Sequence, residues 1–447
     1  MESLKLTKKL NKDKIIEIAK ETKFCIRIRK VDPINFLFSL VFCSSKQCPV
    51  SLRSLASFFD KLVSRTSVHR KFTSEATLFM QKCFQYILSL KIKGCQIETS
   101  LLKKFSKIFI IDSSLWNISS YLKDVFPGSG GSASAASIKT QLIYEYKTGS
   151  IDTIDLKKGS SNDQSYAKTI PEKIGKNYLF LFDLGYWSVD LFTKIQEKGA
   201  FYVSRLKTDV GIWKKNDDGF LKIILEKVLK NQNIPAMEFN AYLKKKHKTR
   251  IVAFRVPEKV ANIRREKLKQ KAMKNSKKYA YKVTEKSLAL CDWSIFITNC
   301  DENLMTGKMI RSVYRIRWTI ELIFKSWKSI LKIDECNAKT NVNRLICEIY
   351  GKLILAVLIF DIYQVTNYTL WENEKKEISF SCVANYVIDN AQLYFNKLKL
   401  SVYKFSAQIN SSLNKIMNNC VKYYQPSRKT TLQRIYETIG DAEPIKI

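Results

Sequence analysis

Histidine is scarce in this sequence, which limits the chemistry that the chain can carry out. The 447 residues include two histidines, His69 and His247. Two histidines argue against a histidine-bound zinc site and against a Ser-His-Asp catalytic triad. The 11 cysteines form no tight pairs; Cys43 and Cys48 are the nearest, and no second pair follows to complete a zinc site. Any hydrolytic chemistry must therefore depend on carboxylates, which suit Mg²⁺ or Mn²⁺.

The distribution of apolar residues also shows neither an export signal nor a membrane-spanning helix. Residues 1–12, MESLKLTKKLNK, contain no apolar segment of the kind found in signal peptides. The most apolar run, residues 345–363, carries Glu348, Lys352 and Asp361, so we expect a buried core helix there and not a membrane span. These absences predict a cytoplasmic protein with reduced thiols and no membrane partner.

Acidic residues are few relative to basic ones. Lys and Arg number 77 against 41 Asp and Glu, a formal charge of +36. Such an excess predicts a polyanionic partner, with nucleic acid as the first choice and a membrane surface as the rival. With 45% apolar and 12% aromatic residues, the chain is a folded protein and not a basic tail. Its length is sufficient for two to four domains.

The order of expected elements indicates an α/β arrangement around one sheet. Short apolar runs predict strands at residues 107–112, 140–146, 151–156, 178–183, 201–205 and 293–298, with a helix at 188–197. Residues 1–100 and 346–447 are expected to be helical. Residues 209–291 combine strand-like patches with basic runs at 244–248 and 264–278, which are typical of solvated faces or loops, or of segments that lie along DNA.

Residues 51–70, SLRSLASFFDKLVSRTSVHR, resemble a helix-turn-helix. Apolar residues form a helical stripe in the first half, a short break follows, and Ser64 is suited to cap a second helix. That second helix would present polar and basic groups to DNA. An ordinary helical hairpin explains the pattern equally well.

Acidic and basic residues share one face of the segment 314–328, YRIRWTIELIFKSWK. On a single helix, Tyr314, Arg317, Glu321 and Lys328 fall within an arc of roughly 60°, beside an apolar stripe. Two strands end in acids, Asp112 and Asp183. Three converging carboxylates predict a two-metal phosphodiester site. Three alternatives stay open. Both aspartates could cap the turn or helix that follows their strand, the helix face could be solvated and stabilised by an Arg317–Glu321 ion pair, or the charged residues could form a structural ion-pair network.

The spacing Tyr314-x2-Arg317-x3-Glu321-x6-Lys328 fits the Y-R-E-K signature of bacterial cut-and-paste DDE transposases of the IS-four insertion-sequence family. IID at 110–112, FDLGYW at 182–187 and FYVSRLK at 201–207 are similar to strands of that family, and the resemblance covers roughly residues 50–360. It implies an RNase H-like (retroviral-integrase-like) catalytic domain in two parts, 101–208 and 292–345. A β-rich insertion at 209–291 would interrupt this domain. Helical regions would flank it, a DNA-binding one at 1–100 and one at 346–447 that is a candidate for dimerisation.

The resemblance also implies a role for each matching residue. The metal-binding catalytic triad would be Asp112, Asp183 and Glu321, holding two Mg²⁺ ions, with Mn²⁺ as a substitute. Contacts to DNA would come from Tyr314, Arg317, Lys328, Arg205, Lys207 and Trp293. Trp293 would stack on a flipped base, although a core tryptophan is an equal alternative. Leu184 departs from some relatives, which carry Arg there.

The activity that the resemblance implies is cut-and-paste transposition of an insertion sequence. The expected steps are nicking at each end, attack by the freed 3′-hydroxyl, with or without a hairpin, and joining to target DNA. The partners would be double-stranded terminal inverted repeats, target DNA and a second copy of the chain, at the bacterial nucleoid. Two alternatives stay open: an RNase H-like nuclease or resolvase without strand transfer, and a non-catalytic DNA-binding protein derived from a transposase.

Overall fold

The computed structural model describes residues 8–27, 30–43, 50–91, 99–130, 134–229, 234–279, 283–374, 376–423 and 430. The strands are β1 (Lys107–Asn117), β2 (Ser137–Glu145), β3 (Ser150–Lys158), β4 (Tyr178–Phe182), β5 (Phe201–Arg205), β6 (Ile212–Asn216), β7 (Gly219–Ile223), β8 (Ala236–Leu243), β9 (His247–Arg255) and β10 (Trp293–Thr298). The helices before and within the sheet region are α2 (Lys12–Glu21), α3 (Pro33–Cys43), α4 (Leu52–Ala56), α5 (Arg65–His69), α6 (Ser74–Ser89), α7 (Ser100–Lys103), α8 (Asp163–Ala167), α9 (Val189–Glu197), α10 (Leu225–Leu229), α11 (Glu258–Tyr279), α12 (Glu285–Ala289), α13 (Gly307–Arg315) and α14 (Trp318–Ser329). The later helices are α15 (Val342–Glu374), α16 (Phe380–Asp389), α17 (Ala391–Leu400) and α18 (Val402–Asn419), and short 3-10 turns include η2 (Ile170–Lys173) and η3 (Leu184–Tyr186).

One sheet runs through the middle of the molecule in the order β3-β2-β1-β4-β5-β10-β9-β8-β6-β7. β1, β4 and β5 are parallel to one another, and β2, β3 and β10 are antiparallel to their neighbours. The α/β arrangement and the expected strands are therefore confirmed. The segment 209–291 joins this sheet, because β9 pairs with β10, and it also contains α11, in which the basic run 264–278 lies.

The central strands are buried on both faces, which explains their continuous apolar sequences. Side chains of a strand alternate between the two faces of the sheet. Ile108 and Ile110 of β1 therefore join one hydrophobic core, whereas Phe109 and Ile111 join the other. Contacts of α6, α14 and α15 with β1 or β3 cover the first face, and α9 covers the second.

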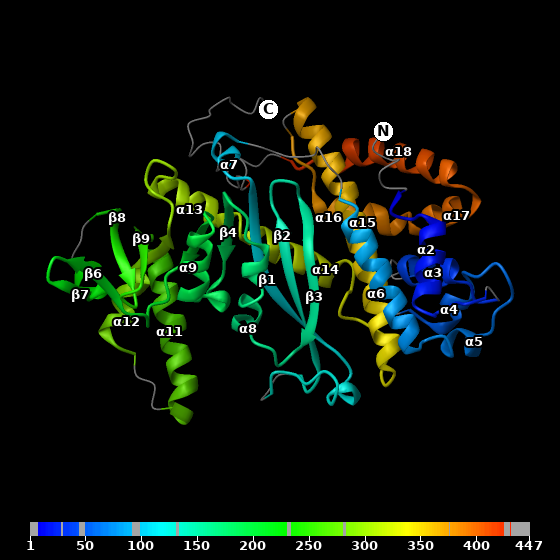
Figure 1. Cartoon of the computed structure of the whole chain (residues 1–447), viewed down its shortest axis with the longest axis horizontal. Coiled ribbons are helices and arrows are strands. Elements are labelled where there is room, and N and C mark those ends of the chain that lie inside the picture. Colours follow the sequence, from blue (N-terminus) through cyan, green and yellow to red (C-terminus); the bar gives the residue numbers. More distant parts are fainter. Residues whose placement is uncertain are drawn as a thin grey trace.

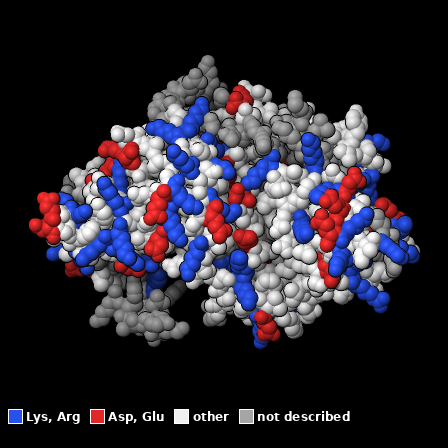
Figure 2. Space-filling model, viewed as in Figure 1, with Lys and Arg blue, Asp and Glu red and all other residues white. Residues whose placement is uncertain are grey.

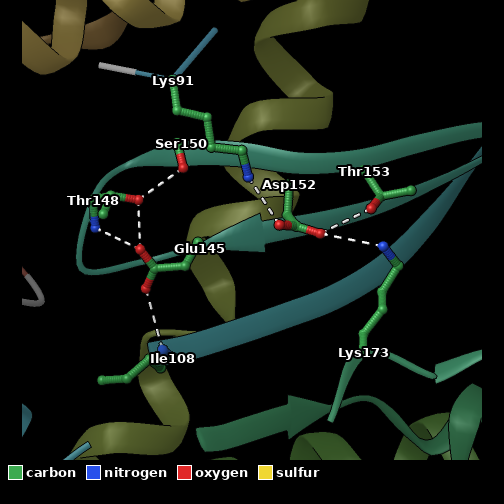
Figure 3. Close-up of polar contacts among 8 residues, drawn as sticks. All are labelled: Lys91, Ile108, Glu145, Thr148, Ser150, Asp152, Thr153 and Lys173. Atoms are coloured by element: carbon green, nitrogen blue, oxygen red, sulfur yellow. Dashed lines mark hydrogen bonds and ion pairs between the residues drawn. The ribbon is translucent and has the colours of Figure 1, made fainter. Parts of the chain in front are cut away.

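The β2–β3 hairpin is tied to its surroundings by two carboxylates at its turn (Figure 3). Glu145 accepts hydrogen bonds from the backbone N–H groups of Thr148, at 2.9 Å, and of Ile108 in β1, at 3.2 Å. Asp152 pairs with Lys91 at the end of α6, at 2.9 Å, and with Lys173 of η2, at 3.4 Å. The expected strand-turn-strand is thus confirmed, and its turn is fixed to both the sheet and the helical region.

The N-terminal and C-terminal helices lie together at one end of the molecule, and β6–β9 lie at the other (Figure 1). α15 is the central helix of this end and packs on α3 and α6. Gly351 permits a close approach to α3, since a Cβ there would lie 2.8 Å from the Leu40 carbonyl oxygen. Most of α15 is buried, as expected for residues 345–363. Among the residues that the structure describes, no helix combines the length and apolarity needed to cross a bilayer.

The charged residues inside α15 are paired, which permits their burial. Lys9 Nζ lies 2.6 Å from the Asp361 carboxylate, and Arg344 Nε lies 2.7 Å from that of Glu348. Lys352 Nζ donates to the Lys332 carbonyl at 2.5 Å and also to the Glu335 carbonyl. The cysteines in the described ranges are free, as predicted for reduced thiols.

The suspected helix-turn-helix consists of two five-residue helices, α4 and α5. Ser64 caps α5 as expected, since its Oγ accepts a hydrogen bond from the Ser67 N–H at 3.1 Å. In α5, Val68 is buried while Arg65, Thr66 and His69 are exposed. The exposed face has the polar and basic character that a DNA contact requires, and its role stays a prediction.

Candidate active site

The segment 314–328 was expected to form one helix, and this prediction was wrong. α13 ends at Arg315 and α14 begins at Trp318, with a turn between them. Around the turn the hydrogen bonds tighten, so that Arg317 N–H reaches the Tyr314 carbonyl at 3.1 Å instead of the carbonyl four residues back. The Tyr314 hydroxyl donates to the Phe182 carbonyl at 3.1 Å, which fixes the end of α13 against the end of β4. This tertiary contact lies outside the reach of helical periodicity.

Asp112 and Asp183 each follow the last residue that pairs in the ladder between β1 and β4. The parallel ladder between β1 and β4 ends with the pair Ile111↔Phe182, and each aspartate is the next residue of its chain. The expectation that the first strand ends at Asp112 was wrong, because β1 continues to Asn117 along β2. Asp112 is therefore still paired with β2 on one side of β1. On the other side, it is the first residue beyond the ladder with β4.

Neither aspartate serves as the simple cap that was considered for it. Asp183 occupies the N-cap position of η3, but its side chain makes no capping hydrogen bond. Asp112 Oδ1 accepts a hydrogen bond from the adjacent Ser113 N–H at 2.8 Å, and Asp112 Oδ2 faces Arg317. The Asp112 carboxylate is thus directed toward the 314–321 segment, and the Asp183 side chain does not cap the turn that follows it.

Arg317 links the acids of the two chain segments. Its Nη1 lies 3.5 Å from Asp112 Oδ2, and its Nη2 forms an ion pair with the Glu321 carboxylate. Its guanidinium lies over the Tyr314 ring, 5.8 Å from the centroid, and its buried Nε has no hydrogen-bond partner. The structure therefore brings Tyr314, Arg317 and Glu321 to the end of the β1–β4 ladder, and their catalytic and DNA-binding roles stay predictions. The ion-pair network considered as an alternative is also present.

The electrostatics of the site favour an added cation. Burial raises the pKa of the Asp112 carboxyl to about 6, and the nearby charges of Asp183 and Glu321 raise it further, against the opposing effects of the Ser113 hydrogen bond and Arg317. Burial likewise raises the pKa of Tyr314 to about 12, so its hydroxyl remains a donor. Carboxylates that disfavour one another's charge are typical of sites for divalent cations.

The donor set fits Mg²⁺ or Mn²⁺ in chemistry, since three carboxylates supply the hard oxygen ligands that these ions require. Within the described ranges, however, no three Asp, Glu, His or Cys side chains are grouped closely enough to hold a metal ion. Arg317 pairs with Asp112 and Glu321 at once, so two of the three carboxylates already have a cationic partner.

The other predicted DNA contacts are spread around this site. Lys328 Nζ donates to the Leu115 carbonyl of β1 at 2.8 Å. Arg205 ends β5 and acts electrostatically on Tyr314. Lys207 forms a surface ion pair with Asp209 at 3.5 Å. These three basic residues remain accessible for a phosphate, and their contact with DNA stays a prediction.

Trp293 and Trp318 differ sharply in exposure. Trp293 is 5% exposed and packs in the core on the α9 face of the sheet, which favours the core alternative over base stacking. Trp318, which follows Arg317 at the start of α14, is 56% exposed. Sequence reasoning gave Trp318 no role, although it directly follows Arg317 in the motif. Asp163 was also missed, and no sequence motif indicates it.

Known proteins are similar to this chain over most of its length. The family model described as Transposase DDE domain matches residues 103–358. The transposase for insertion sequence element IS1151 of Clostridium perfringens is 28% identical over 439 residues, covering 93% of this chain and 91% of that protein. The transposase for insertion sequence element IS231E of Bacillus thuringiensis subsp. finitimus is 28% identical over 457 residues, covering 96% of this chain and 94% of that protein.

Among solved structures, the piggyBac transposase synaptic complex with hairpin DNA covers 96% of this chain and 87% of that chain, with a TM-score of 0.48 and 12% identity. The sequence match is the firmer finding, because the family model spans more than half of the 447 residues and includes Asp112, Asp183 and Glu321. The chain therefore belongs to the transposase DDE family, as its Y-R-E-K motif predicted.

Proposed function

We propose that the chain excises an insertion sequence and joins it to target DNA by phosphoryl transfer at Asp112, Asp183 and Glu321. The observation that carries this proposal is the strand register. Asp112 and Asp183 directly follow the paired residues Ile111 and Phe182, and the 314–321 segment faces them. A site that only stabilised the fold would not require three acids at the end of a parallel ladder.

The order β3-β2-β1-β4-β5 supports the expected RNase H-like catalytic core. In this proposal residues 101–208 and 292–345 form the core, and residues 209–291 form an insertion that extends the sheet through β10. Residues 1–100 and 346–447 would bind DNA and a second copy of the chain. The proximity of both helical regions at one end of the molecule supports their acting together (Figure 1).

In the proposed mechanism the protein first exchanges one set of ionic contacts for another. A phosphate of the transposon end would draw the Arg317 guanidinium away from Asp112 and Glu321, because a charged bidentate contact to phosphate is as favourable as one to a carboxylate. Asp112 and Glu321, released from Arg317, would together with Asp183 hold two Mg²⁺ or Mn²⁺ ions; when bound, such ions would supply activation of the attacking oxygen and stabilisation of the leaving oxygen. Tyr314 keeps the Phe182 carbonyl in place and so positions the backbone before Asp183.

The basic residues around the site would hold the remaining DNA. Lys328, Arg205 and Lys207 would contact phosphates near the triad, and the exposed Trp318 would supply the aromatic surface that the buried Trp293 cannot. Lys and Arg side chains are distributed across the whole visible face, with acidic groups between them (Figure 2). This distribution suits a protein that contacts both terminal repeats and target DNA over a broad surface.

A strand-transfer assay tests the proposal. Purified protein would be incubated with Mg²⁺, target plasmid and duplexes carrying the element's terminal inverted repeat, either intact or pre-cut. We expect nicked ends from the intact duplex and joined product from the pre-cut one, with any hairpin visible on a denaturing gel. Cleavage without joined product would instead identify a nuclease or resolvase.

Matched charge variants locate the chemistry. Asp183→Asn should abolish both products while binding to the terminal repeat persists. Asp217→Asn removes the same charge from an exposed position in the β6–β7 turn and should leave both products unchanged. Undiminished cleavage by Asp183→Asn would show that the catalytic assignment is wrong and would favour a DNA-binding protein with no role for this site.

A further inference from the structure

A second group of polar side chains lies beside the proposed catalytic residues and belongs to none of the motifs. Its centre is Asp163, the first residue of α8, where Asn162 caps the helix by accepting a hydrogen bond from the Ser165 N–H at 2.7 Å. Asp163 Oδ1 accepts from Ser113 Oγ at 2.9 Å and from Gln141 Nε2 at 2.9 Å. Lys139 Nζ lies 3.4 Å from the same oxygen.

These contacts reach the segment that carries the first aspartate. Ser113 follows Asp112 in β1, and Gln141 pairs opposite Ser113 in β2. Asp163 therefore holds two adjacent strands through their side chains at the position next to Asp112. Three donors are directed at Oδ1, so this oxygen is suited to orient the neighbouring side chains.

The same group reaches the segment that carries the second aspartate. A Cβ at Gly185 would lie 3.1 Å from Asp163 Oδ2, so this oxygen closely approaches the turn two residues after Asp183. In that turn, Tyr186 donates its hydroxyl hydrogen to Gln141 Oε1. Tyr186 is 1% exposed, and burial raises the pKa of its phenol, so the hydroxyl remains a donor.

The hydrogen bonds therefore run in one direction, from Tyr186 through Gln141 to Asp163. Because the tyrosine donates to Gln141 Oε1, the amide must present its N–H₂ group to Asp163. This chain connects η3 to β2 and α8, and Ser113 adds β1 to it. This chain of hydrogen bonds lies just beyond Ile111↔Phe182, the pair at which the backbone ladder between β1 and β4 ends.

We propose that Asp163 is a positioning residue that sets the spacing between Asp112 and Asp183 at the phosphodiester site. The inference rests on the proposed function of that site. Beyond the last ladder pair, the described backbone hydrogen bonds no longer join β1 to the chain after β4, and the Asp163 group supplies the connection. Residues that orient metal ligands in this way usually change metal affinity or activity by about 10-fold to 100-fold when removed.

The main variant is Asp163→Asn, which keeps the shape but removes the charge facing Lys139 and places an N–H₂ group on one side. The matched control is Asp155→Asn. Asp155 Oδ2 accepts from the Tyr166 hydroxyl at 2.8 Å and so anchors the same helix, α8, to β3. Asp155 makes no hydrogen bond to the described residues of β1 or η3, so the control removes a carboxylate that holds α8 and leaves the Asp163 contacts to Ser113 and Gln141 chemically intact.

Two measurements separate positioning from folding. The first is Mn²⁺ affinity in the complex with a terminal-repeat duplex, by calorimetry or electron paramagnetic resonance. We expect about 10-fold weaker binding in Asp163→Asn and no change in Asp155→Asn. The second is the nicking rate at saturating DNA, which should fall about 10-fold to 100-fold in Mg²⁺ and recover in part in Mn²⁺, since Mg²⁺ demands the stricter ligand geometry.

The outcomes distinguish this inference from the proposed function. If the native protein neither nicks nor joins DNA, the proposed function fails. If the native protein is active and Asp163→Asn matches it in Mn²⁺ affinity and nicking, or if Asp155→Asn shows the same losses, Asp163 has no positioning role. Should Asp163→Asn fail to fold, Ser113→Ala removes one donor alone and should reduce Mn²⁺ affinity in the same direction; unchanged affinity would overturn the proposal.

Discussion

Replacement of Arg317 by glutamine should have opposite effects on metal binding and on catalysis. Arg317 pairs with Asp112 and Glu321, so a divalent cation must compete with it for both carboxylates. Arg317→Gln removes this competing charge and keeps a polar side chain of similar reach. The same change deletes the proposed phosphate contact, so DNA cleavage should fall while metal binding tightens.

The magnitude follows from Coulomb's law and from the exposure of the site. Two unit charges 4 Å apart interact by about 4 kcal/mol at an effective dielectric of about 20. The side chains of Arg317, Asp112 and Glu321 are 13%, 19% and 32% exposed, so solvent screens part of this energy. Taking about a third of it leaves about 1.4 kcal/mol, which corresponds to roughly tenfold tighter binding of the metal.

The assay is a Mn²⁺ titration of the DNA-free protein, followed by electron paramagnetic resonance at constant pH and ionic strength. Lys328→Gln is the matched control, because Lys328 donates to the Leu115 carbonyl and to no carboxylate of the triad. We expect tighter binding in Arg317→Gln and little change in Lys328→Gln. Weaker or unchanged Mn²⁺ binding in Arg317→Gln would refute the idea that this arginine competes with the metal.

Three further predictions concern stability and DNA contact. Lys352→Met should lower the free energy of unfolding by about 2–4 kcal/mol, because the buried ammonium donates to two backbone carbonyls; an unchanged thermal midpoint would contradict this. Burial lowers the pKa of His247 to about 4 from 6.5, so the unfolded chain binds more protons between these values. The contribution of neutral His247 to the free energy of unfolding should therefore be fully present above pH 6.5 and fall by about 3 kcal/mol toward pH 4. In thermal melts, the midpoint of His247→Gln should depend less on pH than that of the native protein. Trp293→Ala should destabilise the fold by about 3–5 kcal/mol. Trp318→Ala should leave stability almost unchanged and weaken binding to a DNA end with an unpaired base by about 1–3 kcal/mol. Thermal melts and DNA-binding assays check this pair, and equal effects of the two variants would contradict the difference in exposure of the two tryptophans.

Local patterns determined much of the fold. The apolar residues of β4 predict a strand that is buried on both faces, and Ser188 predicts the start of α9 because its hydroxyl accepts an N–H of the first turn. The apolar run 345–363 predicted a buried core helix, because its charged residues argue against a membrane span, and α15 buries these residues with ionic or hydrogen-bond partners. These predictions succeed because propensity, capping and burial depend on residues near one another in the chain.

The tertiary structure alone decided how the proposed site is arranged. The turn at Arg317 lies next to the Tyr314–Phe182 hydrogen bond, and β1 continues past Asp112 along β2. Burial separates Trp293 from Trp318, and Asp163 gains its place only through contacts with distant strands. Spacing in a motif can therefore name the acids and bases of the 314–328 segment, as it did here. Contacts between residues far apart in sequence determine which of them meet, because a strand register or a side-chain hydrogen bond leaves no periodic signal in the chain.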